Sequence, residues 1–232
     1  FEGKENLTDV EKAKLIYDYI TKNIRYSSVS FRQSGLVPQK ASKVISTKLG
    51  DCKDVSTLFV TMCKEVGLDA NLVLVNTRDN GDKDVYLPSI DFNHCIAKIN
   101  LENKPFYVEL TSDLIPFSTQ GTTLRYATVL DIDPSNNDIQ HLDVDTRLKN
   151  EIRRETTLTF EGDDMTVNKK TVKSGEYSGR IRSTYRDIGE EKRKKNMQEG
   201  INDMYVKTKL TNLTFDETLD SNTDMVNFTY EY

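Results

Sequence analysis

The chain has 232 residues, of which 36% are hydrophobic and 30% charged, and it carries a formal net charge of −5. This balance is typical of a globular protein with one substantial core, or one core and a smaller second domain, and it excludes a largely disordered chain. No apolar run approaches the roughly 20 residues of a membrane-spanning helix, and the interleaved charges give no reason to expect a nucleic-acid partner.

Cysteine and histidine are too sparse for a disulfide framework or a structural zinc site. The three cysteines, Cys52, Cys63 and Cys95, form no CxxC pair, and neither of the two histidines has a second soft ligand at metal-binding spacing. We therefore expect no bound metal and no cofactor. No targeting segment is visible ahead of the first predicted helix, so the cellular location is left open.

The first predicted element is an amphipathic helix over residues 9–23. Thr8 and Glu11 have the spacing of a capping box, and apolar residues follow at helical spacing. An extended segment is expected at residues 25–31, and a short helix over residues 41–47.

The next predicted helix starts at Cys52 and takes Gly67 as its C-cap. The residues on the same face as Cys52 are apolar, so its sulfur is expected to point inward: Val55, Phe59, Met62 and Val66. Unpaired N–H groups of a first helical turn and the positive end of the helix dipole favour a thiolate over a thiol. The same position also suits a small residue that merely fills core space.

Three strands are predicted after this helix, over residues 71–77, 93–101 and 105–111. A turn at residues 80–82 and a loop to residue 90 separate the first strand from the second, whereas a short turn makes the last two a hairpin.

The alternation of side chains in this hairpin bears on chemistry. If the apolar sets of its two strands share one face, His94 shares the other face with Glu109. Asp113 has the same parity and is a second candidate carboxylate. A loop of the opposite parity would separate the histidine from both, and the sequence leaves that open.

The second half of the chain differs in composition and in its predicted elements. Residues 131–145 are acidic and loop-like and are interpreted as a linker that contains His141. Further on, β-rich stretches flank a turn at residues 162–164, and a charged helical stretch precedes more strand-like sequence; these segments are residues 156–160, 165–172, 183–198, 204–215 and 225–232. We expect one domain over residues 1–135 and a smaller β-rich domain, whole or in part, over residues 146–232.

Cys52, His94 and Glu109 together form a candidate catalytic set. A thiolate nucleophile needs a histidine that accepts its proton and later protonates the leaving group, and a third polar group that fixes the imidazole. Each residue alone has an ordinary explanation, as a core cysteine, a half-buried strand histidine and a solvent-facing glutamate. Cys63 and Cys95 are interpreted as structural.

Four segments give the chain a resemblance to the transglutaminase-like superfamily, in particular to its bacterial branch with flanking β-rich domains. The segments are residues 19–29 (YITKNIRYSSV), 38–67 (PQKASKVISTKLGDCKDVSTLFVTMCKEVG), 92–96 (FNHCI) and 106–111 (FYVELT). The resemblance implies an α+β, papain-like core with the catalytic helix packed on an antiparallel sheet, a Cys-His-Asp type triad and acyl transfer through a thioester. It also implies a protein or peptide substrate, further β-rich domains in a longer chain, and export to the periplasm or cell surface.

The residues of the set match the family unequally. Cys52 matches the nucleophile and His94 the histidine, but where the family usually has aspartate followed by Pro or Ala and Thr, this chain has Glu109, Leu110 and Thr111. The extra methylene moves the carboxylate by roughly one bond length, and misplacement of ~1 Å can cost ~100-fold in rate. Because the chain has no Trp, the oxyanion donors would be the Cys52 N–H and an upstream polar group.

The expected reaction begins with attack of the Cys52 thiolate on an amide carbonyl while His94 protonates the departing amine. Hydrolysis of the resulting thioester is favoured over transamidation, because water needs no second binding site, and the protein would then be a protease or amidase. The alternative is a catalytically weak or inactive scaffold that binds a protein or glycan partner through its β-rich flank. The glutamate in third place favours this alternative, whereas the intact Cys52 and His94 favour catalysis.

Overall fold

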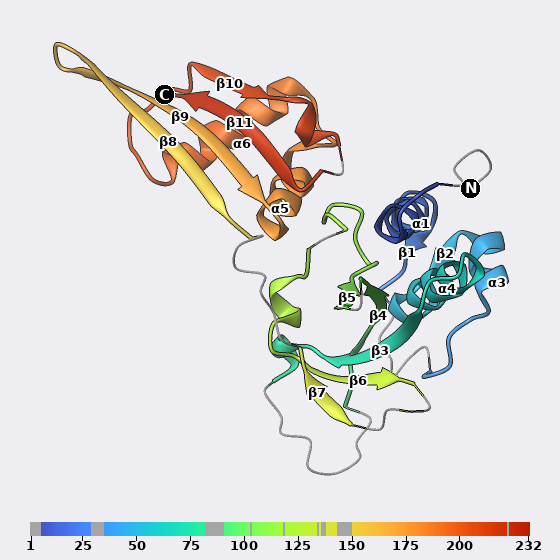
Figure 1. Ribbon diagram of the computed structural model, residues 1–232. Helices are drawn as coiled ribbons and strands as arrows, with labels where there is room; N and C mark the ends of the chain where they lie inside the picture. The colour runs from blue at the N-terminus through green and yellow to red at the C-terminus, as the bar shows by residue number, and fades with distance from the viewer. Residues whose placement is uncertain are drawn as a thin grey trace. The chain divides into compact units, whose positions relative to one another are not determined.

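The computed structural model describes residues 6–28, 35–81, 91–102, 104–117, 119–133, 135, 138–142, 150–221 and 223–232 (Figure 1). The chain divides into two compact units. The N-terminal unit comprises Phe1–Asp113 and Gln120–Asp145, and the C-terminal unit comprises Leu114–Thr119 and Thr146–Tyr232. The predicted domain limits at residues 135 and 146 lie beside or within residues outside the described ranges and stay a prediction.

Helix α1 (Asp9–Asn23) opens the N-terminal unit with its predicted bounds confirmed. The capping box is formed, because Thr8 Oγ1 accepts from the Glu11 N–H at 3.3 Å and the Glu11 carboxylate accepts from the Thr8 N–H at 2.8 Å. Strand β1 (Arg25–Tyr26) follows directly. The extended segment predicted over residues 25–31 is thus a strand only at its start, and its residues 29–31 lie outside the described ranges.

Helix α3 (Ala41–Thr47), also as predicted, leads through Lys48 into strand β2 (Leu49–Gly50). Strand β2 pairs in parallel with β1, so that Tyr26 lies opposite Gly50. A Cβ on Gly50 would lie 2.9 Å from the Cβ of Asp54, closer than real Cβ atoms approach, so this position needs glycine.

Helix α4 (Cys52–Glu65) begins two residues after Gly50. Its C-cap is Val66 rather than the predicted Gly67, which lies one residue further on with a φ of 80°. Glycine tolerates this left-handed conformation, so it still marks the end of the helix.

The N-terminal unit contains a five-stranded antiparallel sheet in the order β5-β4-β3-β6-β7. Its strands are β3 (Ala70–Asn76), β4 (His94–Leu101), β5 (Lys104–Val108), β6 (Thr128–Ile132) and β7 (Ile139–His141), and two short 3-10 helices, η1 (Arg78–Asn80) and η2 (Thr122–Leu124), lie in the connections. Two predictions are wrong here. The prediction of a strand through residue 111 fails because β5 ends at Val108, and the linker interpretation fails at residues 139–141, where His141 pairs with Thr128. The side chains of β7 are all exposed, so this strand has no apolar alternation to reveal it.

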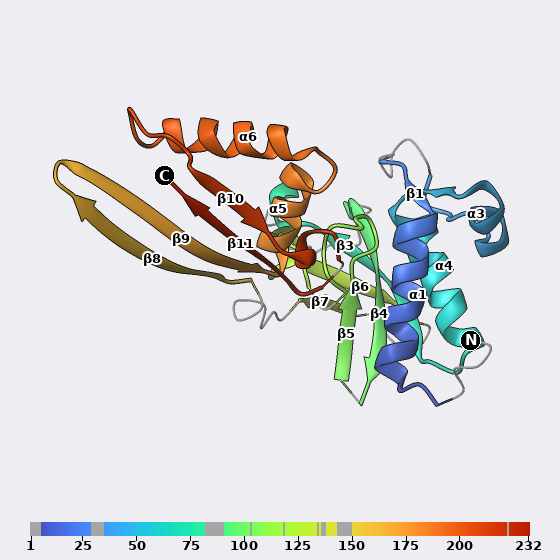
Figure 2. The same ribbon diagram turned by 90° about the horizontal axis from the view of Figure 1, so that it is seen from above.

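Helix α4 packs on β4 and β3, and α1 lies beside α4 in both views (Figures 1 and 2). The predicted α+β architecture, with the cysteine helix on an antiparallel sheet, is therefore confirmed. The opposite face of the sheet is also covered, by a cluster that includes Val73, Ile96, Leu124 and Leu142. Because both faces are buried, the strand that carries His94 is held rigidly.

The C-terminal unit is a four-stranded antiparallel sheet in the order β10-β11-β9-β8 with two helices. Its elements are β8 (Ile152–Glu161), β9 (Asp164–Ser174), α5 (Glu176–Tyr185), α6 (Glu190–Asn202), β10 (Asn212–Phe215), the 3-10 helix η3 (Glu217–Leu219) and β11 (Met225–Glu231). Figure 2 shows α6 running along this sheet. The predicted single helical stretch is in fact two helices separated at residues 186–189, and the strand-like residues 204–215 form a strand only at their end.

The core of this unit joins both helices to the sheet through Ile181, Tyr185, Ile201, Phe228 and Tyr230. Beside it lies a buried guanidinium. Arg182 is 1% exposed and donates to four backbone carbonyls, those of Leu114, Thr218, Thr223 and Met225. No helix among the residues that the structure describes has the length and apolar character needed to cross a membrane.

Candidate active site

Cys52 is the first residue of α4, directly after the N-cap Asp51. The Asp51 carboxylate accepts from the N–H groups of Lys53 and Asp54 at 3.1 and 3.2 Å, and the Asp54 carboxylate accepts from the Asp51 N–H at 3.2 Å. The N–H of Cys52 has no acceptor in the described part of the chain. This leaves one backbone donor of the helix N-terminus beside the thiol, where anions are favoured.

The acidic residues on either side of Cys52 each have a polar partner. Lys53 forms a buried ion pair with Asp51. The Asp54 carboxylate accepts from the backbone N–H and the side-chain Nε2 of Gln39, each at 2.8 Å. Buried carboxylates need such partners, and here the partners also limit the negative field that the thiolate experiences.

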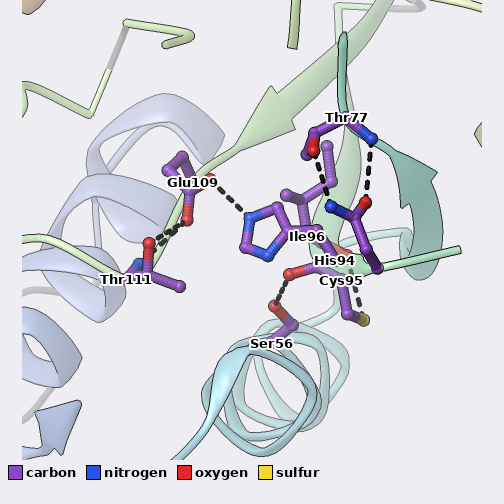
Figure 3. Close-up of polar contacts among 8 residues, drawn as sticks. Ser56, Thr77, His94, Cys95, Ile96, Glu109 and Thr111 are labelled. Atoms are coloured by element: carbon purple, nitrogen blue, oxygen red, sulfur yellow. Dashed lines mark hydrogen bonds and ion pairs between the residues drawn. The ribbon is translucent and has the colours of Figure 1, made fainter. Parts of the chain in front are cut away.

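His94 is the first residue of β4 and lies opposite Val75 of β3. Its Nε2 is 2.7 Å from Oε2 of Glu109 (Figure 3). The side chain of the preceding Asn93 makes two hydrogen bonds to Thr77: its Oδ1 accepts from the Thr77 N–H at 2.9 Å and its Nδ2 donates to Thr77 Oγ1 at 2.7 Å. The start of the strand is therefore fixed where the imidazole projects.

Glu109 lies one residue beyond the end of β5. Its two carboxylate oxygens have separate partners: Oε2 contacts His94, while Oε1 accepts from the Thr111 N–H at 3.0 Å and from Thr111 Oγ1 at 2.7 Å (Figure 3). The strand register, with Ala97 opposite Val108, confirms the predicted parity that brings histidine and glutamate together. The carboxylate that bonds His94 is thus that of Glu109, and the alternative candidate Asp113 lines a neighbouring cavity.

The charges of this pair reinforce one another. Burial alone would lower the pKa of His94, but the negative charge of Glu109 and hydrogen bonds with Cys52 and Glu109 raise it to about 10. Burial alone would raise the pKa of Glu109, but the imidazolium charge and the hydrogen bonds from His94 and Thr111 lower it. At neutral pH the two side chains therefore form an imidazolium–carboxylate pair. Because Nε2 faces Glu109, Nδ1 is the ring nitrogen left for Cys52.

Tyr26 is a site residue that sequence reasoning missed. Its half-buried ring packs against Cys52 and Cys95, where the pairing of β1 with β2 positions it. Burial, followed by the negative charges of Cys52 and Glu109, raises the pKa of Tyr26 to about 12, so the phenol keeps its proton and can donate. A tyrosine that follows an arginine has no local signal that links it to a cysteine 26 positions later, since the two meet through a parallel strand pair.

The two other cysteines are buried, and burial raises the pKa of each thiol, that of Cys63 to about 12. Neither is therefore a thiolate at neutral pH. Within the described ranges, no group of three or more His, Cys, Asp or Glu side chains could hold a metal ion.

Residues 2–109 match the family model of the transglutaminase-like superfamily. This part of the chain, just under half of it, is similar to that superfamily. Cys52, His94 and Glu109 all fall inside the matched residues of this transglutaminase-like core. No curated protein sequence matches the chain.

Several solved structures are similar to the chain, and two of them are described as proteases. One is described as a "putative protease" from Parabacteroides distasonis ATCC 8503, with 9% identity, a TM-score of 0.48, and coverage of 98% of this chain and 46% of that one. The other is described as a "putative cysteine protease" from Cytophaga hutchinsonii, with 17% identity, a TM-score of 0.35, and coverage of 62% of this chain and 52% of that one. The chain thus spans about half the length of these two proteins.

Proposed function

We propose that the transglutaminase-like core catalyses cysteine-dependent acyl transfer on an amide or peptide bond of a protein or peptide. Cys52 is the nucleophile, His94 the general acid and base, and Glu109 the group that orients the imidazole. The observation that carries this proposal is the 2.7 Å contact between His94 Nε2 and Glu109 Oε2, which leaves Nδ1 for the hydrogen bond with Cys52. A nucleophile, a base and an orienting group in this order are the working parts of acyl transfer.

In the proposed reaction, the Cys52 thiolate attacks the amide carbon and the carbonyl oxygen becomes an oxyanion. The Cys52 N–H and the Tyr26 hydroxyl donate to this oxygen, so Tyr26 is the upstream polar group that the sequence left unassigned. His94 gives its Nδ1 proton to the amine as the C–N bond breaks, which leaves a thioester on Cys52. Water then attacks the thioester, His94 takes its proton, and the acid and the Cys52 thiolate are released.

The glutamate in third place is compatible with this role. Thr111 holds Oε1 by two hydrogen bonds, so the longer side chain is anchored while Oε2 reaches the imidazole. This anchoring weakens the case for the inactive scaffold, which rested on the change from aspartate to glutamate.

Hydrolysis, as by a protease or amidase, is favoured over transamidation because it requires no second substrate site. A comparison of amine and water as acceptors, by mass spectrometry of the products, separates the two reactions.

The decisive test of an activated thiol is alkylation by iodoacetamide between pH 5 and pH 9. We expect wild-type Cys52 to label well below pH 8, and His94→Ala to lose this reactivity. A Cys52→Ala variant identifies the labelled residue, since Cys63 and Cys95 are also present. Half-maximal labelling of the wild type near the ordinary thiol value of about 8.5 would contradict the proposal and favour the scaffold.

A further inference from the structure

A cavity of about 390 Å³ lies between the C-terminal end of α1, strand β1 and residues 110–113. It shares two residues with the candidate active site. Tyr26, which packs on Cys52, forms part of its wall, as does Thr111, which holds the Glu109 carboxylate. A group bound in this cavity would therefore lie about one side chain away from the reacting sulfur.

Three basic residues line the cavity: Lys22, Arg25 and Lys48. None of their side chains forms a hydrogen bond or an ion pair with any residue that the structure describes. In the same unit, the buried Lys53 is paired with Asp51 and the partly buried Lys98 with Asp131. The cavity is thus lined by three positively charged side chains that no described residue neutralises.

Neighbouring negative charge does not cancel these cations. Asp113 is the acidic residue of the lining. Lys22 lies in the last turn of α1 and Lys48 caps the end of α3, so two helix C-termini are close by. A helix end carries about half a negative elementary charge, so the two ends and Asp113 offset about two of the three positive charges. A positive excess of about one charge remains in a protein whose net charge is −5.

We propose that this cavity is a substrate subsite that binds a carboxylate, so that the enzyme prefers acyl-transfer substrates with an acidic group near the scissile amide. That the bound carboxylate belongs to a substrate rests on the proposed function, although the binding itself does not depend on catalysis. Arginine binds carboxylates in a planar, two-pronged manner, and lysines add point charges. A peptide extends about 3.3–3.6 Å per residue. With the scissile amide at Cys52, an acidic residue one to three positions away can therefore reach past Tyr26 into the cavity.

The test uses the full chain with Cys52→Ser, which cannot form a thioester. Three tripeptides are titrated at about 20 mM ionic strength while amide chemical shifts are followed by NMR: acetyl-Glu-Glu-Glu-amide, acetyl-Gln-Gln-Gln with a free C-terminal carboxylate, and acetyl-Gln-Gln-Gln-amide. We expect the first to shift residues 22–26, 48 and 110–113, and the neutral peptide to leave them unchanged. Binding by the second peptide as well would show that a C-terminal carboxylate is an equally good source of the charge.

Variants assign the binding to the cavity. Arg25→Gln and Lys48→Gln should each weaken binding of the glutamate peptide at least threefold, and 200 mM salt should weaken it further because exposed charges are screened. Lys14→Gln is the matched control, since Lys14 lies on α1 but is paired with Asp18 and outside the lining. Equal binding of the neutral peptide, or equal affinity in the Arg25 and Lys48 variants, would overturn the inference.

The two proposals can fail separately. An unreactive Cys52 with specific binding of the glutamate peptide would overturn the catalytic proposal and leave the anion site. A reactive Cys52 with no preference for acidic peptides would overturn the anion site alone.

Discussion

Oε2 of Glu109 lies 2.7 Å from Nε2 of His94, although the two residues are 15 positions apart and the carboxylate lies beyond the end of its strand. The contact arises because a tight hairpin sets the register of β4 and β5, and Thr111 then fixes the other carboxylate oxygen. The protonation states of His94 and Glu109 depend on this one contact.

Removal of the Glu109 charge should lower the pKa of His94. In Glu109→Gln the burial of the imidazole remains but its main countercharge is lost, so the pKa of His94 should fall well below 10, with Cys52 as the remaining partner that raises it. The titration of the imidazole protons by NMR measures this shift. Alkylation of Cys52 at neutral pH should slow by about 10²–10⁴-fold, the usual worth of an acid–base partner. A His94 pKa that stays near 10 in the variant would show that another group supplies the charge.

The raised pKa of His94 also predicts how stability changes with pH. Because the pKa is about 10 in the folded protein and 6.5 without the fold, the stabilisation is complete below pH 6.5 and is lost as the pH rises through 10. Over this window the residue should lower the free energy of unfolding by up to about 1.4 kcal/mol per pH unit. Urea unfolding of the wild type and of His94→Gln at pH 6.5, 8 and 9.5 provides the measurement. Parallel pH profiles would contradict it.

The lowered pKa of Glu109 makes stability change with pH in the opposite direction. Its stabilisation is present above the ordinary carboxyl value of 4.5 and is lost as the pH falls through the lower folded value. Acid unfolding of Glu109→Gln should therefore depend less on pH than that of the wild type. An identical acid transition in both proteins would indicate that Glu109 is not paired.

The hydroxyl of Tyr26 should matter for acylation and not for alkylation. Tyr26→Phe keeps the ring that packs on Cys52 but removes one donor to the oxyanion, which typically costs ~10²–10³-fold in kcat. Alkylation by iodoacetamide forms no oxyanion, so its rate should change by less than about threefold. Tyr19→Phe, on the exposed side of α1, is the control. Equal losses in both reactions would indicate a structural role for Tyr26 instead.

Gly50 should tolerate no side chain. In Gly50→Ala the new Cβ would lie 2.9 Å from the Cβ of Asp54, so the start of α4 must shift, at a cost of about 1–3 kcal/mol. Gly121→Ala provides a control in the same unit, because its nearest atom would be at 3.8 Å. The free energies of unfolding and the rate of Cys52 alkylation should both fall in the first variant only. A first variant as stable as the second would show that the helix start adapts.

Arg182 should be essential to the C-terminal unit. Arg182→Met removes the donor that the four carbonyls share, and a buried polar group left unsatisfied typically costs about 1–3 kcal/mol. Arg180→Met, two residues earlier on the exposed side of α5, should change stability little. Thermal unfolding of the two variants makes the comparison, and similar midpoints would contradict this reading.

Local chemistry made much of the N-terminal unit predictable. The capping box at Thr8, the helix start at Cys52 and the alternation around His94 each depend on residues close in sequence, and each is present in the structure. The parity argument succeeded because a side-chain period of two leaves only two choices, and apolar burial selects one.

Other features depend on pairings that a single sequence does not display. Tyr26 reaches Cys52 through a parallel pair of two-residue strands. Strand β7, with every side chain exposed, forms through backbone bonds alone, so its composition reads as a loop. The break between α5 and α6 falls at residues 186–189, where Gly189 is the N-cap of α6, and the run of charged residues that follows conceals it.

The two-sided anchoring of Glu109 limits what the imidazole of His94 can do. With Nε2 held by a carboxylate that Thr111 keeps in place, the ring cannot flip to exchange its nitrogens without breaking the contact. In the proposed reaction one nitrogen, Nδ1, must therefore deliver the proton to the leaving amine and later collect it from the incoming water. Both molecules need the same position in turn, so the first product has to depart before the second half-reaction begins, and the kinetics are of the ping-pong type.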